Sequence, residues 1–185
     1  MSVHAYILAG GKSSRMGEDK GLLLFHDKPL IQYVINVFSE ITENIFIVTS
    51  NKAYEKFGFP LIEDIKKELG PAGAIDAVLH HSTVKKSLII ACDMPFIDAG
   101  SINNLISESH HSEITVPLYH HYPEALFGIY DQSCKVKWRQ LIERDVLKLS
   151  DLLSHFETNF VDGDRMCALN SKLFQNMNTK DDLNR

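Results

Sequence analysis

The residues best suited to chemistry in this sequence stand in a glycine-rich, basic segment near its start. In chain order they are Leu8, Ala9, Gly10, Gly11, Arg15 and Lys20. Adjacent glycines leave backbone N–H groups open to a ligand, because they lack a Cβ and tolerate positive φ. The guanidinium and ammonium groups that follow suit phosphate oxygens. The segment therefore indicates a nucleotide-phosphate loop, although a flexible basic loop explains its glycine content equally well.

Two common glycine-rich loops do not fit this segment. A Walker A loop needs a glycine where the chain has Tyr6, counted back from Gly11-Lys12-Ser13. The dinucleotide fingerprint fails because Gly10 and Gly11 are adjacent and the next glycine is Gly17. The segment therefore belongs to neither of these nucleotide-binding classes.

Apolar runs that end in polar residues predict the elements that would position this chemistry. Buried strands are predicted over residues 3–8, 45–48 and 87–92, and an amphipathic helix over 29–41. Strand, helix and strand within about fifty residues are typical of a parallel α/β sheet. Ligands of such sheets collect at the carboxyl ends of strands, so polar residues there are candidates for binding.

Polar residues follow the second strand and open a later helix. Thr49 and Asn51 are placed to contact a base or ribose, or equally to cap the next helix. Gly70 and Pro71 begin a predicted helix, whose N-terminus offers free N–H groups to a polar or anionic ligand. These four residues are candidates for nucleotide binding.

Asp93 is the candidate for holding a cation. It ends the strand at residues 87–92 and has Pro95 two residues on, a place where a hard cation would be held. The alternative is that it only caps the turn, which we would favour without the first segment. Near the end of the chain, Asn178 or Thr179 is predicted as the N-cap of a last helix.

The opening segment matches a longer pattern, L-A-G-G-x-x-x-R-M-G-x-x-K, with an Asp before the last Lys. It is complete at residues 8–11, 15–17 and 19–20. The pattern resembles the signature of the nucleoside-triphosphate transferases, and most closely that of the molybdenum cofactor guanylyltransferases (molybdopterin-guanine dinucleotide biosynthesis protein A). The resemblance runs in matching order from Leu8 through Asn178.

The resemblance implies roles for the candidate residues. The backbone of residues 8–11 would hold the nucleotide, with Arg15 and Lys20 on its phosphates. The C-D-x-P pattern at Asp93 resembles the family's metal-binding aspartate, which implies Mg²⁺ there. Asn178 lies in a segment similar to the family's N-x-N-T, near the active site, and is a second candidate for positioning the metal or phosphates.

Other family positions are matched less closely. An Asn at the end of the second strand contacts the nucleotide in the family, and here Thr49 or Asn51 takes that place. Family members carry an acidic residue and then a G-P-L-A-G-I-like turn. Asp64 matches the acidic residue and Gly70-Pro71 the start of the turn, whereas residues 72–74 depart from it. The acceptor substrate is implied near Tyr122-Pro123, where a His-Pro pair is frequent.

The function implied by the resemblance is transfer of GMP from GTP to the terminal phosphate of molybdopterin, with release of pyrophosphate. The choice of guanine rests mainly on the L-A-G-G form of the loop. The alternatives are a cytidylyltransferase of the same cofactor or a small sugar-phosphate nucleotidyltransferase. A nucleotide-binding sensor without activity is a third hypothesis, against which Arg15, Lys20 and Asp93 argue.

Length and composition limit the classes of protein. With 185 residues, we expect one domain over residues 1–185: a three-layer α/β/α fold with a mostly parallel, Rossmann-like sheet of about seven strands. A net charge of −5 argues against nucleic-acid or membrane partners. No signal peptide or membrane span is predicted, and three scattered cysteines fit reduced thiols in the cytoplasm. Transient contacts with other cofactor-biosynthesis or acceptor proteins are also expected.

Overall fold

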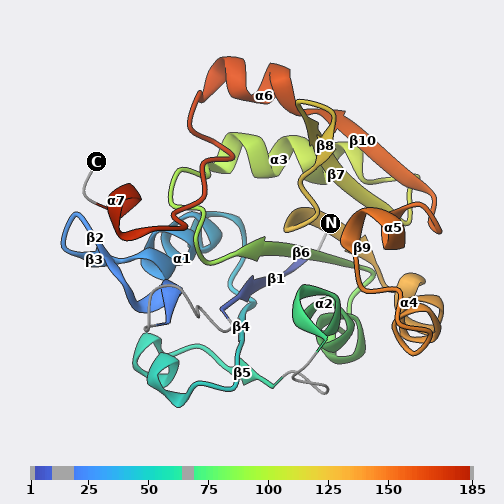
Figure 1. Cartoon of the computed structure of the whole chain (residues 1–185), viewed down its shortest axis with the longest axis horizontal. Helices are drawn as coiled ribbons and strands as arrows, with labels where there is room; N and C mark the ends of the chain where they lie inside the picture. The colour runs from blue at the N-terminus through green and yellow to red at the C-terminus, as the bar shows by residue number, and fades with distance from the viewer. Residues whose placement is uncertain (1–2, 10–18, 64–68, 184–185) are drawn as a thin grey trace.

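A computed structural model describes residues 3–9, 19–63 and 69–183 of the chain. Figure 1 shows a central sheet with helices on both of its faces. The predictions for Gly10, Gly11, Arg15 and Asp64 lie outside the described residues.

The central sheet has eight strands, in the order β10-β7-β9-β6-β1-β4-β5, with β8 paired to β7. Their bounds are β1 (Val3–Leu8), β4 (Ile45–Val48), β5 (Leu61–Ile62), β6 (Lys86–Ala91), β7 (Ile114–Tyr119), β8 (Tyr122–Pro123), β9 (Phe127–Asp131) and β10 (Thr158–Asp162). The pairings β1–β4, β1–β6, β4–β5 and β7–β10 are parallel, whereas β9 runs antiparallel to both of its neighbours. The expected α/β class with a mostly parallel sheet is confirmed.

The helices form a layer on each face of the sheet (Figure 1). One face is covered by α1 (Leu30–Ile41), α3 (Ala99–Glu108) and α6 (Gly163–Leu169), and the other by α2 (Gly70–His81), α4 (Cys134–Ile142) and α5 (Leu149–Leu153). Shorter elements are η1 (Lys20–Leu22), η2 (Lys52–Phe57), α7 (Lys180–Leu183) and a hairpin of β2 (Leu24–Phe25) and β3 (Lys28–Pro29). Among the helices of the described ranges, none is long and apolar enough to cross a membrane.

Strand β1 shows why the core has two halves. Successive side chains of a strand point to opposite faces. Accordingly Ile7 packs in the cluster beneath α1 and α3, and Tyr6 packs in the cluster beneath α2 and α4. In the second cluster the fully buried Trp138 of α4 also donates its indole N–H to the carbonyl of Ala72 in α2, at 3.0 Å. Burial of such a side chain stabilises the fold by about 1.5–3 kcal/mol, so both helices are held firmly on the sheet.

Two local expectations were wrong. Pro29 does not open α1 but ends β3, and the helix begins at Leu30. Residues 122–130 read in sequence as one strand, near an edge of the sheet because of Pro123, but they form β8, a turn and the central strand β9. The turn is closed by a hydrogen bond of 2.9 Å from the Phe127 N–H to the Glu124 carbonyl, which reverses the chain before β9 enters the sheet.

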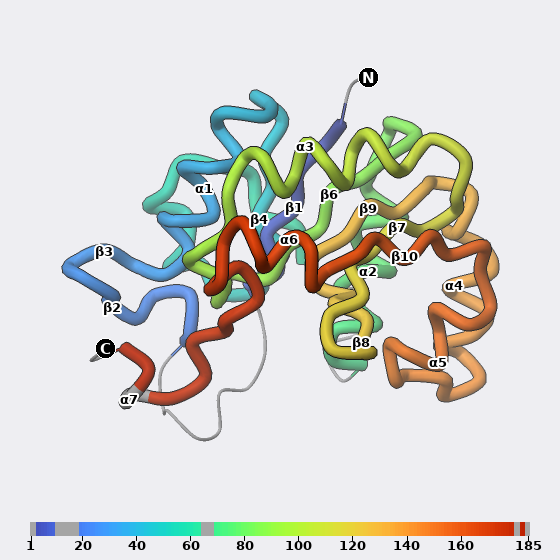
Figure 2. Tube along the Cα trace, turned by 90° about the horizontal axis from the view of Figure 1, so that it is seen from above, coloured from blue at the N-terminus to red at the C-terminus, as the bar shows by residue number. Residues whose placement is uncertain are grey.

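The C-terminal segment returns to the start of the chain. Figure 2 shows α7 beside the β2–β3 hairpin, although the two are far apart in sequence. Met177 is buried with Leu23, Phe25 and Leu30, and its N–H donates to the carbonyl of Asp93 at 2.9 Å. This packing brings residues 176–178 to the carboxyl end of β6.

Candidate active site

Three of the predicted residues meet at the carboxyl end of β6. The Lys20 ammonium lies 3.2 Å from Oδ2 of Asp93 and donates to Oδ1 of Asn178 at 2.7 Å. Lys20 comes from η1, Asp93 follows β6, and Asn178 precedes α7. Sequence separations of 73 and 158 residues are thereby closed by the fold.

Lys20 is positioned by the residue before it. The Asp19 carboxylate caps η1 by accepting from the Gly21 N–H at 3.3 Å, and it also accepts from the Tyr54 hydroxyl and from Nδ2 of Asn51 at 3.0 Å. Gly21 is required here, since a Cβ at this position would lie 2.4 Å from the Tyr54 hydroxyl oxygen. Burial raises the pKa of Tyr54, so its hydroxyl stays protonated as a donor to Asp19.

Thr49 and Asn51 have local structural roles. Thr49 is buried, and its hydroxyl accepts from the Asn51 N–H at 3.1 Å. Oδ1 of Asn51 caps η2 by accepting from the Ala53 N–H at 3.0 Å, while its amide group binds Asp19. The capping alternative therefore describes Asn51 in this structure, and contact of Thr49 or Asn51 with a nucleotide stays a prediction.

Four more candidates lie at neighbouring strand and helix ends. Leu8 ends β1 and Ala9 follows it; both are buried, and the Leu8 carbonyl accepts from the Cys92 N–H at 3.1 Å. Gly70 starts α2 with a φ of 58°, followed by Pro71 in the first turn, and the N-cap residue Leu69 makes no side-chain cap. The N–H groups at a helix start can bind an anion, and contact of Gly70 or Pro71 with a nucleotide stays a prediction.

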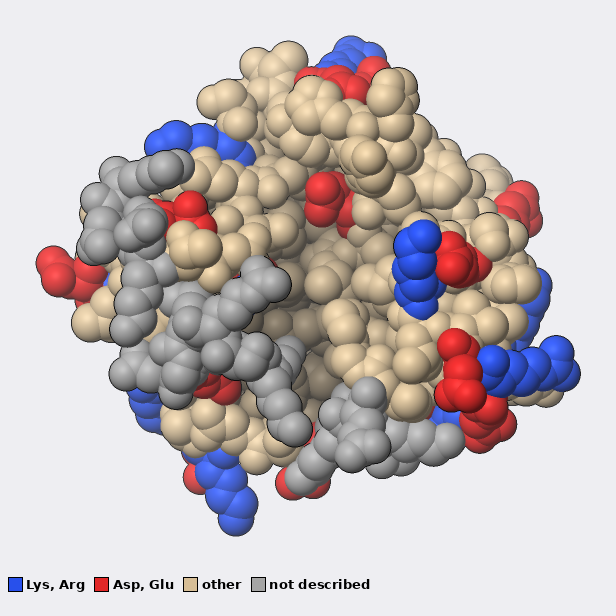
Figure 3. Space-filling model, viewed as in Figure 1, with Lys and Arg blue, Asp and Glu red and all other residues tan. Residues whose placement is uncertain are grey.

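A cavity of about 370 Å³ opens beside the Lys20 cluster. Its polar lining consists of Lys20, Asp93, Glu124, Asn176 and Asn178. Figure 3 shows a hollow near the centre of this face, over the region where β6 ends in Figure 1. The sequence did not single out Glu124 or Asn176, although Asn176 stands in the N-x-N-T segment and Glu124 directly follows Pro123.

Comparison with known proteins identifies the kind of site. Residues 5–158 match the family described as the MobA-like NTP transferase domain. The chain belongs to this family. A probable molybdenum cofactor guanylyltransferase of Flavobacterium johnsoniae is 40% identical over 152 residues, covering 80% of this chain and 79% of that protein. The molybdenum cofactor guanylyltransferase of Vibrio parahaemolyticus is 33% identical over 181 residues, covering 96% and 91%.

A solved structure extends the likeness to the whole fold. Molybdopterin-guanine dinucleotide biosynthesis protein A from Archaeoglobus fulgidus superposes with a TM-score of 0.83 and 26% identity. The match covers 98% of this chain and 95% of that one. The expected family is therefore confirmed by sequence and by structure.

The NTP transferase family points to a divalent metal, and two oxygen atoms of the site suit one. Oδ2 of Asp93 and Oδ1 of Asn178 already converge on one cationic group, the Lys20 ammonium. A hard divalent cation takes carboxylate and amide oxygens of this kind. Within the described ranges, no three or more His, Cys, Asp or Glu residues gather as a metal cluster. A cation at Asp93 would therefore take further ligands from a bound substrate.

A thiol next to the site is unsuited to nucleophilic chemistry. Cys92 precedes Asp93 and is buried. Burial, and secondarily the negative charge of Asp93, raise the pKa of the Cys92 thiol well above its ordinary value. Because the thiolate is the reactive form, Cys92 acts as a packing residue beside Gly21.

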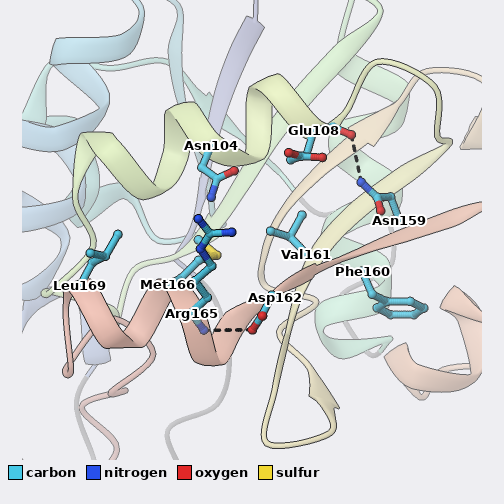
Figure 4. A pocket seen from close by; sticks show the side chains of 9 residues that line it. All are labelled: Asn104, Glu108, Asn159, Phe160, Val161, Asp162, Arg165, Met166 and Leu169. Atoms are coloured by element: carbon cyan, nitrogen blue, oxygen red, sulfur yellow. Dashed lines mark hydrogen bonds between the residues drawn. The ribbon is translucent and has the colours of Figure 1, made fainter.

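A second cavity, of about 470 Å³, lies away from this transferase site, between α3, β10 and α6 (Figure 4). Two of its polar side chains are used in local structure. Asp162 caps α6 by accepting from the Arg165 N–H at 2.9 Å, and Asn159 donates to the Glu108 carbonyl at 3.0 Å. Despite its larger volume, this cavity lacks the converging cation and oxygen ligands of the Lys20 cluster.

Proposed function

We propose that this protein transfers GMP from GTP to the terminal phosphate of molybdopterin and releases pyrophosphate, forming the guanine dinucleotide form of the cofactor. The observation that carries the proposal is the convergence of Lys20, Asp93 and Asn178 beside a cavity, in a chain 40% identical to a probable molybdenum cofactor guanylyltransferase. The alternatives, a cytidylyltransferase of the same cofactor or a small sugar-phosphate enzyme, gain no support from these relatives.

The reaction is a direct displacement at phosphorus. An oxygen of the acceptor phosphate forms a bond to the α-phosphorus of GTP while the bond from that phosphorus to the bridging oxygen breaks, and pyrophosphate leaves. No enzyme nucleophile is needed, so catalysis rests on positioning and on neutralising charge. The Lys20 ammonium, held at the strand end by the Asp19 cap, supplies a fixed positive charge for the phosphate oxygens.

The proposal includes a magnesium ion held by Asp93, with Asn178 as a second oxygen ligand. Mg²⁺ prefers one or two protein oxygens plus those of substrate phosphates, which fits a site with one carboxylate and one carboxamide. When bound, it would withdraw charge from the phosphate oxygens. The proposed nucleotide site also includes the backbone of residues 8–11, Arg15 on the phosphates, and Asp64 with the start of α2 near the base.

We further propose that residues 1–185 act as one catalytic domain in the cytoplasm. The continuous sheet and the free thiols support this, and the net charge of −5 argues against nucleic-acid or membrane partners. Protein contacts would be transient, with other enzymes of cofactor biosynthesis or with acceptor enzymes.

The test is pyrophosphate release with molybdopterin and Mg²⁺, with GTP, CTP, UTP and ATP offered separately and in competition. We expect release with GTP above the other three. Asp93→Ala should lose turnover while circular dichroism shows an unchanged fold. Binding of GTP without pyrophosphate release, given authentic acceptor, would refute the enzyme proposal. Activity of Asp93→Ala within a few-fold of wild type would refute the role of Asp93.

A further inference from the structure

Glu124 lines the 370 Å³ cavity, and its carboxylate has no partner among the residues that the structure describes. Its backbone is fixed, because its N–H donates to Pro117 and its carbonyl accepts from Phe127, both at 2.9 Å. In the part of the chain that the structure describes, its side chain makes no hydrogen bond or ion pair. Burial raises the pKa of Glu124, as expected for a carboxylate that lacks a donor.

A second acceptor in the same cavity is also unpaired. Oδ1 of Asn176 is buried and has no hydrogen-bond partner among the described residues. A buried polar atom left unpaired costs about 1–3 kcal/mol. With this buried oxygen and the half-buried Glu124 carboxylate, the cavity is suited to a ligand edge rich in donors.

The rest of the lining defines the ligand further. Met94, Leu126 and Leu149 give the cavity apolar walls that suit a flat ring. Lys20, which donates to Asn178, lines the same cavity and supplies a cationic group suited to a phosphate. The matching ligand is a heterocycle with adjacent N–H donors on one side and a phosphate group on the other.

Lys20 and Asp93 line this cavity, but the order of the sheet separates it from the other described residues predicted to bind the nucleotide. Those residues follow β1 and β4 or begin α2, on one side of β6. Glu124 belongs to the turn before β9, which pairs with β6 on the opposite side. The cavity is therefore placed for the acceptor rather than for the base of the nucleotide.

We propose that Glu124 determines acceptor specificity by binding the donor edge of the pterin ring. The two carboxylate oxygens would accept from N3–H and from the 2-amino group, and Oδ1 of Asn176 would accept the second amino hydrogen. This inference rests on the proposed function and names the residue that recognises its acceptor.

The test compares two rings that differ in their hydrogen-bond donors and acceptors. Pterin offers two donors at N3–H and the 2-amino group, whereas lumazine has N3–H beside a carbonyl. A Gln amide, with one acceptor and one donor, complements lumazine. Binding of 6-hydroxymethylpterin phosphate and 6-hydroxymethyllumazine phosphate to the full chain is followed by their fluorescence. We expect wild type to prefer the pterin by about 10-fold or more, and Glu124→Gln to lose or reverse that preference.

Controls separate this inference from other roles of the carboxylate. Glu108→Gln, an exposed carboxylate in the cavity beside α6, should keep the wild-type preference. GTP affinity and its Mg²⁺ dependence should be unchanged in Glu124→Gln. An unaltered ratio of pterin to lumazine affinity in that variant would overturn the inference. So would an equal loss of GTP affinity or a shifted Mg²⁺ requirement, which would assign Glu124 to the nucleotide or the metal.

Failure of the inference and failure of the proposed function are distinguishable. The ring preference is measured by binding alone, without turnover. If wild type makes no guanine dinucleotide from GTP and molybdopterin, the proposed function fails whatever the ring preference is. If it makes the product and Glu124→Gln keeps the pterin preference, the inference alone fails.

Discussion

Lys20 is the residue on which the geometry of the site depends most. Its ammonium contacts oxygen atoms supplied by two distant segments, Asp93 and Asn178, and its side chain is 30% exposed toward the cavity. In a transfer between phosphates, a fixed cation at this point offsets charge that develops on non-bridging oxygens. The Lys20 ammonium should therefore contribute to the rate of transfer.

Replacement of Lys20 by Met tests that contribution. Loss of one preorganised charge in such a site typically lowers the rate by about 100- to 1,000-fold, and we expect a decrease of that order in kcat for pyrophosphate release. Lys28→Met, at an exposed lysine in β3, is the matched control and should retain activity. A Lys20→Met enzyme within a few-fold of wild type would show that the ammonium does not serve the transferred phosphate.

Single residues of the site were predictable where a motif carried them. Lys20 was predicted from the glycine-rich pattern that follows the first apolar run, and Asp93 from its place directly after a buried strand; the structure brings the two together. Glu124 and Asn176 were missed because their significance lies in what they lack, a hydrogen-bond partner inside a cavity. That property depends on packing among distant segments and leaves no local signal in the sequence.

At the scale of elements, η1 and η2 form one unit through Asp19. The carboxylate accepts from the Gly21 N–H in η1, from the Tyr54 hydroxyl in η2, and from the Asn51 side chain that caps η2. The carboxylate thereby ties the start of η1, and with it Lys20, to the end of β4. We interpret Tyr54 as a positioning residue that acts on the phosphates through Asp19 and Lys20.

Tyr54→Phe should therefore affect catalysis more than folding. It removes one donor to a charged acceptor, a loss of about 1.5–3 kcal/mol at most, and keeps the buried ring. We expect kcat to fall by about 10-fold, because Lys20 loses its fixed position, while KM for the acceptor stays close to wild type.

Tyr33→Phe is the matched control for this variant. It removes a hydroxyl that donates to the Phe25 carbonyl at 2.7 Å, away from Asp19. Urea unfolding and steady-state kinetics are measured for both variants. If Tyr54→Phe loses as much stability as Tyr33→Phe and keeps the kcat of wild type, Tyr54 has only a structural role.

Element types were more predictable than element boundaries. Helical spacing of apolar residues correctly predicted α1, and short continuous apolar runs correctly predicted β1, β4 and β6, which are buried along nearly their whole length. The prediction failed at residues 122–130, where apolar residues lie on both sides of Glu124 and the turn is closed by backbone hydrogen bonds that no side-chain pattern specifies. Hairpin β2–β3 likewise displaced the helix start expected at Pro29.

At the scale of the whole molecule, the order of strands decides which residues share the site. Antiparallel β9 enters between β6 and β7, and the C-terminal segment packs against Leu23 and Phe25 of the first hairpin region. These two arrangements bring Glu124 and Asn178 to the same strand end as Asp93. Neither follows from local sequence, since the first depends on the pairing of Ile90 with Phe127 and the second on contacts such as that of Lys20 with Asn178, 158 residues away.

The opposite end of the β6–β9 pair holds a buried ion pair. Lys86 begins β6 and Asp131 ends β9, and the two are partners in the strand register. The Lys86 ammonium lies 3.0 Å from Oδ2 of Asp131 and donates to the Ser112 carbonyl at 2.6 Å, with side-chain exposures of only 3% and 9%. Because the pair and Asp93 lie at opposite ends of the strand, stability can be altered here apart from the chemistry.

Burial alone would raise the pKa of Asp131, but hydrogen bonds from the Ser133 N–H and from Lys86 lower it below its ordinary value of 3.8. A carboxyl group with a lowered pKa in the folded state stabilises the fold fully above its unfolded value. That contribution is lost as the pH falls through the folded value. Protonation of Asp131 therefore weakens the protein only below about pH 3.8.

Asp131→Asn should leave the Lys86 charge buried and unpaired, and we expect it to reduce the free energy of unfolding at pH 7 by about 3–5 kcal/mol in urea titrations. The difference from wild type should shrink below pH 3.8, where wild type also loses the ionised carboxylate.

The double variant Lys86→Met with Asp131→Asn removes both charges and should recover most of the loss. Its pyrophosphate release should match wild type, because the pair is remote from Asp93. If the double variant is as unstable as Asp131→Asn, the loss comes from packing or from the Ser133 hydrogen bond rather than from an uncompensated charge.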